Sequence, residues 1–340
     1  MAQPFVGWLS SFGVGDESAW GTPVTPTKFF RHAGFKPGEK WPKVEYEAFS
    51  GMSPMAHDRG LYQVMPEIVI PGVYTGMEYL FYHLFGKAPT IAVPGGGTLA
   101  RTQTYVFDDG TAPPAGLTGE AVYKRGSLGT PKAYTLAGMK VLGVTIDFNE
   151  DRTMGFTFRV AAKHMAVQGS PTTVTYPADT LPIYWSHIVA KKGGASFAFR
   201  SGSIEIDPGL IDDQRQMGSY YILEPTRARK RAVTFKLSTD FENEATLRDL
   251  LAGVSAGTAP ADAGFRLQIT ATHPNANSIE TGQAYSWDLD MKDCYLDDYD
   301  LPMPDEGIVG CEVSGFSQKE AAGVNEIAIL TTKNKVTAVP

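Results

Sequence analysis

Two segments of this chain, separated by nearly half its length, carry the same helical pattern. Residues 75–86 and the region from residue 239 to 254 each place apolar side chains at the i, i+3, i+4, i+7 spacing of a helix with one buried face. These apolar positions are Met77, Leu80, Phe81 and Leu84 in the first segment and Leu247, Leu250, Leu251 and Val254 in the second. The repeated pattern predicts two short helices of one design.

Each predicted helix also has matching start and stop signals. A Thr-x-x-Glu spacing that suits a capping box begins at Thr75 and again at Thr239. Each segment ends in a glycine, which suits the left-handed turn after a helix, and these glycines, Gly86 and Gly253, lie 167 residues apart in a chain of 340. The spacing predicts a duplicated domain, and duplication favours symmetric assembly over a single catalytic cleft.

Much of the remaining chain alternates apolar and polar residues with the period of two that is typical of β-strands. Residues 142–148 and 156–160 alternate on either side of a polar turn at 149–151, which predicts a hairpin. Residues 287–291 begin a second hairpin, which turns near 302–306 and returns over 308–316. Further strands are predicted over 43–49, 61–70, 203–207, 232–238 and 265–271. The expected fold class is mainly β with short helices, as two tandem sandwich or half-barrel domains, each with one packed helix.

The order strand, loop, strand, helix and hairpin occurs twice, and it sets the expected domain boundaries. Residues 1–27 are predicted to form an extended N-terminal arm rather than a packed element, because Gly, Ser, Thr and Pro crowd this stretch without periodicity. Its aromatic residues, Trp8, Phe12 and Trp20, are candidate docking anchors. The first β domain is expected over 28–165, a linker over 166–195, the second β domain over 196–330 and a C-terminal tail over 331–340.

The acidity of the chain is concentrated at its C-terminal end. The formal net charge is −7; residues 1–250 carry 24 acids and 25 bases, a balance of +1, whereas residues 251–340 carry 13 acids and 5 bases, a balance of −8. A nucleic-acid-binding protein is expected to show an excess of Lys and Arg, so this class is disfavoured. No apolar run approaches the roughly 18 residues of a membrane span, and no basic and apolar leader is recognisable, so synthesis in a cytoplasm is expected.

No group of residues has the spacing of a catalytic, cofactor or metal site. The six histidines form no paired-ligand motif. Cys294 and Cys311 could face each other across a hairpin, but reduced, partly buried thiols are expected. The sequence His-Asp-Arg at 57–59 resembles half of an acid–base site, but a polar loop explains it better. The run PGGGT at 94–98 lacks the lysine of a phosphate loop and is expected to be a flexible turn. No catalytic residue, cofactor or metal ligand is therefore expected.

Two charged clusters are candidates for contacts between chains. The basic run contains Arg227, Arg229, Lys230 and Arg231, and we expect it to meet an acidic patch on a partner rather than nucleic acid. The acidic series nearer the C-terminus has four candidate positions, which are Asp288, Asp290, Asp293 and Asp297. This series does not match a calcium loop, because Lys occurs at position five and Tyr at position twelve. A solvated sheet face is the alternative explanation of these acids.

The stretch from Phe12 to Phe30, FGVGDESAWGTPVTPTKFF, resembles the opening of tail tube proteins of long-tailed bacteriophages. The matching positions are Gly13, Gly15, Glu17, Gly21, Thr22, Pro23, Pro26 and Thr27, ahead of a first strand. A short helix followed by long hairpins is also similar to that family. The resemblance implies a structural virion protein, the major tail protein. Such a protein self-assembles into stacked rings that form a tail tube, the conduit for DNA passage into the host.

The resemblance carries further expectations about assembly. In that family, curved sheets close into a shared β-barrel around a lumen, so the four acids become candidate lumen or interface residues. The arm with Trp8, Phe12 and Trp20 becomes a candidate ring-to-ring contact. Single-domain members build six-fold rings, so two domains per chain favour a trimer with pseudo-six-fold symmetry, and a hexamer is the fallback.

The resemblance also implies partners and a location. The expected partners are other copies of the chain, other tail proteins and, in transient passage without sequence preference, double-stranded DNA. The protein is expected in the virion tail after synthesis in the cytoplasm of a host bacterium, without a membrane partner and without enzymatic activity.

Two alternative classes share the β-rich pattern. One is another virion or secretion-tube component, such as a baseplate, capsid-surface or secreted-tube protein. The other is a β-rich enzyme or carbohydrate-binding module, in which Trp185 and Trp287 would stack on sugars, although alternation favours a core position for Trp287. Annular particles with an open lumen would distinguish a tail tube protein from the second class.

Overall fold

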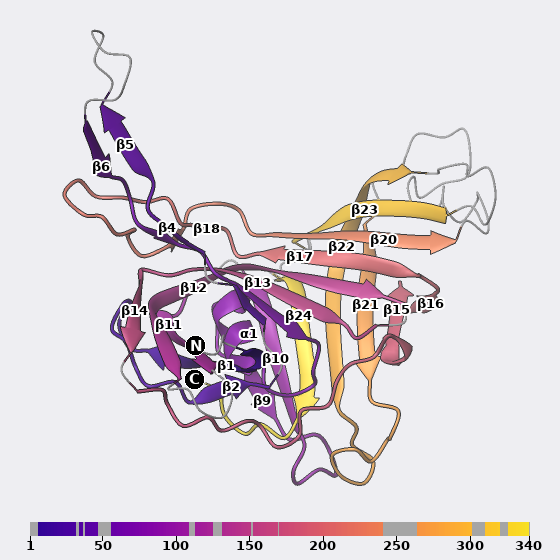
Figure 1. Ribbon diagram of the computed structural model, residues 1–340. Coiled ribbons are helices and arrows are strands. Elements are labelled where there is room, and N and C mark those ends of the chain that lie inside the picture. The colour runs from indigo at the N-terminus through magenta and orange to yellow at the C-terminus, as the bar shows by residue number, and fades with distance from the viewer. Residues whose placement is uncertain are drawn as a thin grey trace.

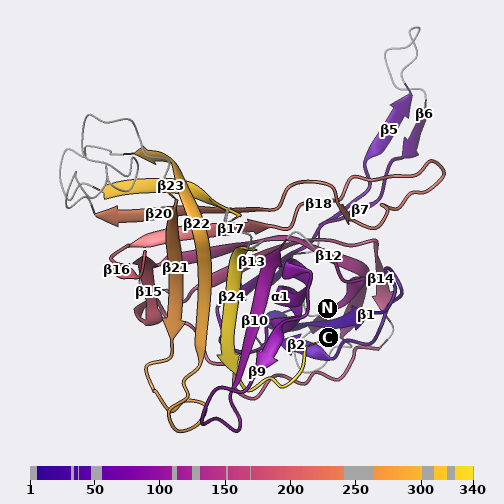
Figure 2. The same cartoon turned by 180° about the vertical axis from the view of Figure 1, so that it is seen from behind.

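Antiparallel strands account for most of the chain, as Figures 1 and 2 show. The computed structural model describes residues 6–31, 34–36, 38–46, 56–108, 113–124, 131–150, 152–168, 170–240, 264–300, 310–319 and 326–339. Its largest sheet has 18 strands and stays open, and within these residues there is one α-helix, α1 (Glu78–Phe85). The expected fold class, mainly β with a minor helix, is confirmed.

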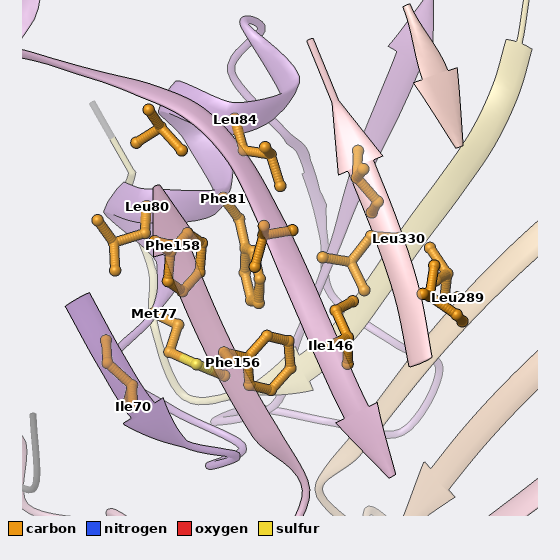
Figure 3. Close-up of a cluster of buried hydrophobic side chains, with 14 of the residues drawn as sticks. Ile70, Met77, Leu80, Phe81, Leu84, Ile146, Phe156, Phe158, Leu289 and Leu330 are labelled. Atoms are coloured by element: carbon orange, nitrogen blue, oxygen red, sulfur yellow. The ribbon is translucent and has the colours of Figure 1, made fainter. Parts of the chain in front are cut away.

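Helix α1 packs into the core through the apolar face that its sequence predicts. Figure 3 shows Leu80, Phe81 and Leu84 directed at the sheet, and the Phe81 ring lies 5.8 Å from that of Phe156 and 6.2 Å from that of Phe158. The helix ends at Gly86, whose φ of 75° is the predicted left-handed turn.

The predicted helix starts are wrong. Helix α1 begins at Glu78, whose carboxylate accepts a hydrogen bond from the Gly76 N–H at 2.9 Å, while the buried hydroxyl of Thr75 has no described partner. Thr239, the predicted start of the second helix, belongs to strand β20 (Ala232–Asp240) instead. The rest of the predicted second helix lies outside the described residues.

The longest strand, β12 (Lys132–Asn149), pairs with different strands along its two halves. The first-half partners are β11 (Gly116–Lys124) and β14 (His164–Gln168), and the second-half partners are β13 (Gly155–Ala161) and β17 (Ser201–Asp207). The predicted first hairpin is confirmed, because Ile146 lies opposite Phe156 and Val144 lies opposite Phe158. Strands β13 and β14 share one side of β12, and β11 and β17 share the other.

Strand β22 (Ser286–Asp300) has a similar arrangement in the second half of the chain. Its partners are β21 (Phe265–Thr272), β23 (Gly310–Gln318) and β24 (Glu326–Asn334). Cys294 lies opposite Phe265 on one side and opposite Ser317 on the other, so β21 and β23 flank β22. Trp287 is buried in the core, as its alternation with Asp288 predicts.

The outer strands also correspond between the two halves. The first half contains β1 (Val6–Glu17), β2 (Lys28–Phe30), β3 (Gly34–Lys36) and β8 (Glu67–Pro71). The second half contains β15 (Ile188–Lys192), β16 (Ala195–Phe197), β17 and β20. The short 3-10 helix η1 (Trp185–His187) precedes β15.

Seven strand pairings therefore occur in both halves in the same arrangement. In the first half they are β1–β2, β1–β11, β11–β12, β12–β13, β12–β14, β8–β13 and β3–β8. In the second half they are β15–β16, β15–β21, β21–β22, β22–β23, β22–β24, β20–β23 and β17–β20. This correspondence supports the duplication that the two helical segments suggested.

Two pairings join the halves into one body. Strand β12 pairs with β17, and β10 (Arg101–Asp108), which also pairs with β9 (Thr90–Ala92), pairs with β24. One hydrophobic cluster includes residues of both halves. The expected linker at 166–195 therefore does not separate two cores.

Two connections that join equivalent strands in the two halves leave the sheet on one side, as Figure 1 shows. Residues 37–66 join β3 to β8, and residues 208–231 join β17 to β20. The strands of the first are β4 (Glu39–Lys40), β5 (Lys43–Tyr46), β6 (Ala56–Arg59) and β7 (Gln63–Val64); those of the second are β18 (Leu210–Ile211) and β19 (Thr226–Arg227). The predicted polar loop at 57–59 is therefore part of a strand, β6. The β5–β6 hairpin projects from the body (Figure 1).

Candidate assembly site

One face of the large sheet is polar and faces away from α1. Thr145 and Thr157 lie opposite each other on this face, and their neighbours Ile146 and Phe156 point to the core. Three ion pairs extend along the face, and each joins two exposed or half-exposed side chains. The pairs are Lys36–Glu67 at 3.7 Å, Arg159–Glu205 at 2.7 Å and Lys236–Glu312 at 2.6 Å. Cations and carboxylates are thus balanced in this set.

The four candidate acids lie on β22, but they differ in what they contact. Asp290 is buried and accepts two hydrogen bonds from the Arg266 guanidinium, at 2.6 and 2.8 Å, and this contact raises the pKa of Arg266. Asp288 accepts from Gln268 at 2.8 Å, and burial raises its pKa. Asp293 is half-buried and Asp297 is exposed. Two of the four acids are thus engaged by side chains of β21.

The N-terminal segment differs from the expected unpacked arm, because residues 6–17 form β1 and pair with β11 and β2. The Phe12 ring is buried and stacks on that of Phe35 at 4.8 Å. The Trp20 indole N–H donates to the Gly138 carbonyl at 2.8 Å. Trp8 lies in β1. Phe12 and Trp20 therefore make contacts within their own chain.

A buried carboxylate organises the turn after β1. Glu17 accepts hydrogen bonds from the Gly21 N–H at 2.7 Å, the Thr118 hydroxyl at 2.7 Å and the Gly138 N–H at 2.9 Å. Gly21 has a φ of 76°, a conformation that L side chains rarely adopt. These contacts explain why a glutamate and a glycine occur at this spacing in the N-terminal motif.

The basic cluster does not form one surface. Arg229 and Lys230 are exposed, whereas Arg231 is buried with its guanidinium carbon 4.6 Å from the centre of the Phe107 ring. No hydrogen-bond partner of the Arg231 guanidinium occurs among the described residues. Arg227 is half-buried in β19. Only Arg229 and Lys230 are thus freely presented to a partner.

The PGGGT run leads into three backbone amides that bind a carboxylate of the same chain. The Glu280 carboxylate accepts hydrogen bonds from the backbone N–H groups of Thr98, Leu99 and Ala100, at 2.9, 3.1 and 2.8 Å, and from the Thr98 hydroxyl at 2.9 Å. The backbone donors lower the pKa of Glu280 to about 2. The expected turn occurs at Gly95 and Gly96, and the backbone amides that follow it hold a carboxylate of the same chain.

A buried lysine anchors the second connection to the first half. The Lys140 side chain is 1 % exposed, and its Nζ lies 2.8 Å from Glu224 Oε1 of the connection 208–231 and also donates to the Pro114 carbonyl. The Tyr62 N–H donates to the Tyr220 carbonyl at 2.9 Å in the same region. Sequence patterns missed this lysine, because one Lys in a strand gives no signal of burial.

Two of the strand edges that have no partner among the described residues bear on assembly. On β22 the β21 side is paired as far as Cys294, so residues 295–300 are unpaired on that side. On the corresponding side of β12, strand β17 pairs with residues 144–149. The other edge is the side of β3 that faces away from β8. Unpaired edges are templates for pairing with another chain.

The described residues give little support for metal binding, a membrane-spanning helix or a reactive thiol. No group of three or more His, Cys, Asp or Glu side chains there is placed to hold a metal ion, and no helix there is long and apolar enough to cross a membrane. Cys294 and Cys311 are buried and form no disulfide, and they lie opposite Ser317 and Thr239 rather than opposite each other. Burial raises the pKa of the Cys294 thiol to about 12, which disfavours the reactive thiolate.

Comparison with known protein families identifies the family of this chain. The family model of the phage tail tube protein matches residues 7–317, which is nearly the whole chain. This chain is a member of the phage tail tube protein family. A comparison with curated proteins found no matching sequence.

Membership makes the chain a structural component of a virion tail. Self-association, contact with other tail proteins and passage of DNA through the assembled tube are consistent with that role. The match begins at residue 7, so it includes the N-terminal segment that suggested the family. The polar sheet face, the unpaired edges and the two connections are therefore features of a tail tube protein.

Proposed function

We propose that three copies of this tail tube protein close into a ring with pseudo-six-fold symmetry. The observation that carries the proposal is the pairing of β12 with β17, which joins the two halves within one chain. The equivalent of β12 in the second half is β22, and the equivalent of β17 in the first half is β3. Repetition of the junction therefore pairs the free side of β22 in one chain with β3 (Gly34–Lys36) of the next, and these two edges are then no longer unpaired.

The polar face of the sheet lines the lumen in this proposal. The opposite face is covered by α1 and the core, so only the polar face is free to border a channel. Each of the three ion pairs on this face joins one cation to one carboxylate, so these six side chains together carry no net charge. A wall without excess cations suits moving DNA, because each phosphate neutralised by Lys or Arg releases counterions and adds to binding.

One N-terminal aromatic residue and the exposed bases make the other proposed contacts between chains. We propose that Trp8, at the start of β1, contacts the adjacent ring, while Phe12 and Trp20 fasten the segment to its own chain. Arg229 and Lys230, which are exposed, meet acids such as Asp297 of a neighbouring chain. The protein is made in the cytoplasm of the host bacterium and has no catalytic activity.

Electron microscopy with native mass spectrometry tests the ring. Purified protein is expected to give annular particles or tubes, with three chains counted per ring. Six chains per ring would overturn the pseudo-six-fold proposal while leaving a tube, and a monomer at every concentration would overturn the ring itself.

The position of the lumen has its own test. Replacement of Thr145 and Thr157 by Lys places added cations on the polar face, so tubes of this variant are expected to retain DNA in a salt-dependent way. Ala276→Lys, at an exposed loop position, is the control and should leave DNA passage unchanged. Equal DNA retention by both variants would show that the polar face does not border the channel.

A further inference from the structure

The outer end of the connection 208–231 presents large apolar side chains to solvent. Met217 is fully exposed, and Tyr220 and Trp41, whose ring centres lie 6.5 Å apart, are 52 % and 40 % exposed. Ile222 of the same connection is buried, so the exposure is confined to its outer end. We call Met217, Tyr220 and Trp41 the apolar tip. Apolar side chains gathered at the end of a projecting segment mark a surface for contact with another protein.

An apolar groove of about 260 Å³ lies at the other end of the same sheet. Its apolar walls are formed by Phe148 of β12, Trp185 and Val189 of the segment from η1 into β15, and Phe197 and Phe199 at the end of β16. Trp185 and Val189 are 51 % and 41 % exposed at this concave surface. The groove can therefore receive an apolar side chain from outside the chain.

Strands β12 and β17 separate the groove from the tip. Arg200 of the groove comes directly before β17, and the connection 208–231 begins directly after that strand. On β12, the groove lies at Asn149 whereas Glu224 of the connection contacts Lys140, so roughly 30 Å of strand separate them. Figure 1 shows the connection and the strands β15 and β16 at opposite ends of the sheet.

In the proposed ring, these two ends of the sheet become the two rims. Strands of a barrel wall run from one rim to the other, so the tip lies at one rim and the groove at the opposite rim. Rings that stack in one direction bring each rim against the opposite rim of the next ring, and such head-to-tail contacts repeat without closing. An apolar tip and an apolar groove therefore meet wherever two rings stack.

We propose that the apolar tip of one chain inserts into this groove of a chain in the next ring, with Met217 as the side chain that enters. The inference rests on the proposed ring and names a contact that stacks it. Methionine suits this position, because its unbranched thioether side chain adapts to an irregular apolar wall. Each chain has one tip and one groove, so three such contacts join two rings of three chains.

Disulfide trapping in assembled tubes tests the contact. Met217→Cys on the tip and Ser186→Cys at the exposed rim of the groove are combined in one chain. A disulfide needs Cα atoms within about 7 Å, and these positions lie at opposite ends of a chain, so only different chains are joined. Mild oxidation of tubes is expected to give a ladder of linked chains on a non-reducing gel, and dispersed chains should give none.

The control for this experiment combines Met217→Cys with Ala276→Cys, at an exposed loop position, and should give no ladder. Tubes of the Met217→Cys and Ser186→Cys variant that form without a ladder would overturn the contact. An equal ladder from the control would overturn it as well, because the tip would then have no preference for the groove.

Substitution in the groove gives an independent measurement by electron microscopy. Val189→Glu places a charge in the apolar groove and leaves the junction of β22 with β3 unaltered, so single rings without stacking are expected. Val93→Glu, at a valine that is 55 % exposed between β9 and β10, is the matched control and should stack normally. Stacked tubes of Val189→Glu would overturn the inference. Unstacked wild-type rings would overturn this contact alone, whereas a wild-type chain that forms no ring would overturn the proposed function.

Discussion

The side-chain amide of Asn334 donates a hydrogen bond to the Glu78 carboxylate at 2.9 Å, although 256 residues separate the two positions. Glu78 is the first residue of α1 in the first half, and Asn334 is the last residue of β24 in the second half. Both side chains are buried. The contact ties the only described α-helix to the final strand and so couples the two halves inside the core.

Glu78 is expected to make stability depend on pH. Burial raises the pKa of Glu78 above its ordinary value of 4.5, so this group stabilises the fold most below pH 4.5 and loses that contribution as pH rises through its folded-state pKa. In Glu78→Gln, which keeps an acceptor for the Gly76 N–H, the free energy of unfolding should vary less with pH above 4.5. Urea unfolding at several pH values measures this. Parallel curves for the two proteins would contradict the assignment.

The Glu17 network is expected to be a main source of stability for β1. Glu17→Ala leaves three donors unpaired, so a loss of about 3 kcal/mol in the free energy of unfolding is expected at roughly 1 kcal/mol per donor. Ser18→Ala, at the exposed neighbouring position, is the control and should change stability by less than about 0.5 kcal/mol. Similar losses in both variants would show that the network is not specific.

Two ion pairs in the chain should differ in energetic weight. Glu224→Ala leaves the buried Lys140 ammonium without its carboxylate and is expected to cost about 1–3 kcal/mol, less than for a fully buried pair because Glu224 is 44 % exposed. Glu205→Ala removes the exposed pair with Arg159 and should cost at most about 1 kcal/mol. Thermal unfolding of the monomers compares them. Equal melting temperatures would contradict the role given to Lys140.

The turn held by Glu280 should resist acid. Because its pKa is lowered to about 2, the carboxylate stays ionised in the folded protein well below pH 4.5, and its stabilising effect should decline from about pH 4.5 and be lost below about pH 2. The amide resonances of Thr98 and Ala100 are expected to titrate with a midpoint near 2, and Glu280→Gln should abolish that transition. A midpoint near 4.5 would show that the turn does not bind the carboxylate in solution.

Strands with one solvated face were the most predictable part of the fold. Residues 232–238 alternate because Val233, Phe235 and Leu237 face the core while the residues between them face solvent. Strand β1 was missed, because Ser11 to Gly15 are buried on both faces and show no alternation. Strand β15 was missed with it, so the first strand of each half was expected outside its domain.

The candidate assembly residues were less predictable, because their roles depend on which strands and connections meet in the fold. The sequence gives no sign that Lys140 is buried, because its partner Glu224, whose carboxylate lies 2.8 Å from Lys140 Nζ, belongs to a distant connection. Composition likewise cannot show that Arg231 turns inward onto Phe107 while Arg229 and Lys230 stay exposed. The family, by contrast, was recognisable from the small residues and Glu17 of the N-terminal motif, whose backbone geometry tolerates few substitutes.

The three-residue length of β3 has a kinetic consequence for tube growth. So short an edge offers few backbone hydrogen bonds, so two chains that meet only there in the proposed ring separate quickly. In a closed ring, two chains that separate at one junction are still held together through the other junctions. Their edges therefore stay at high effective concentration, and each junction lasts longer. A short edge strand would thus keep newly synthesised chains from polymerising early and delay tube formation until growth begins on a template.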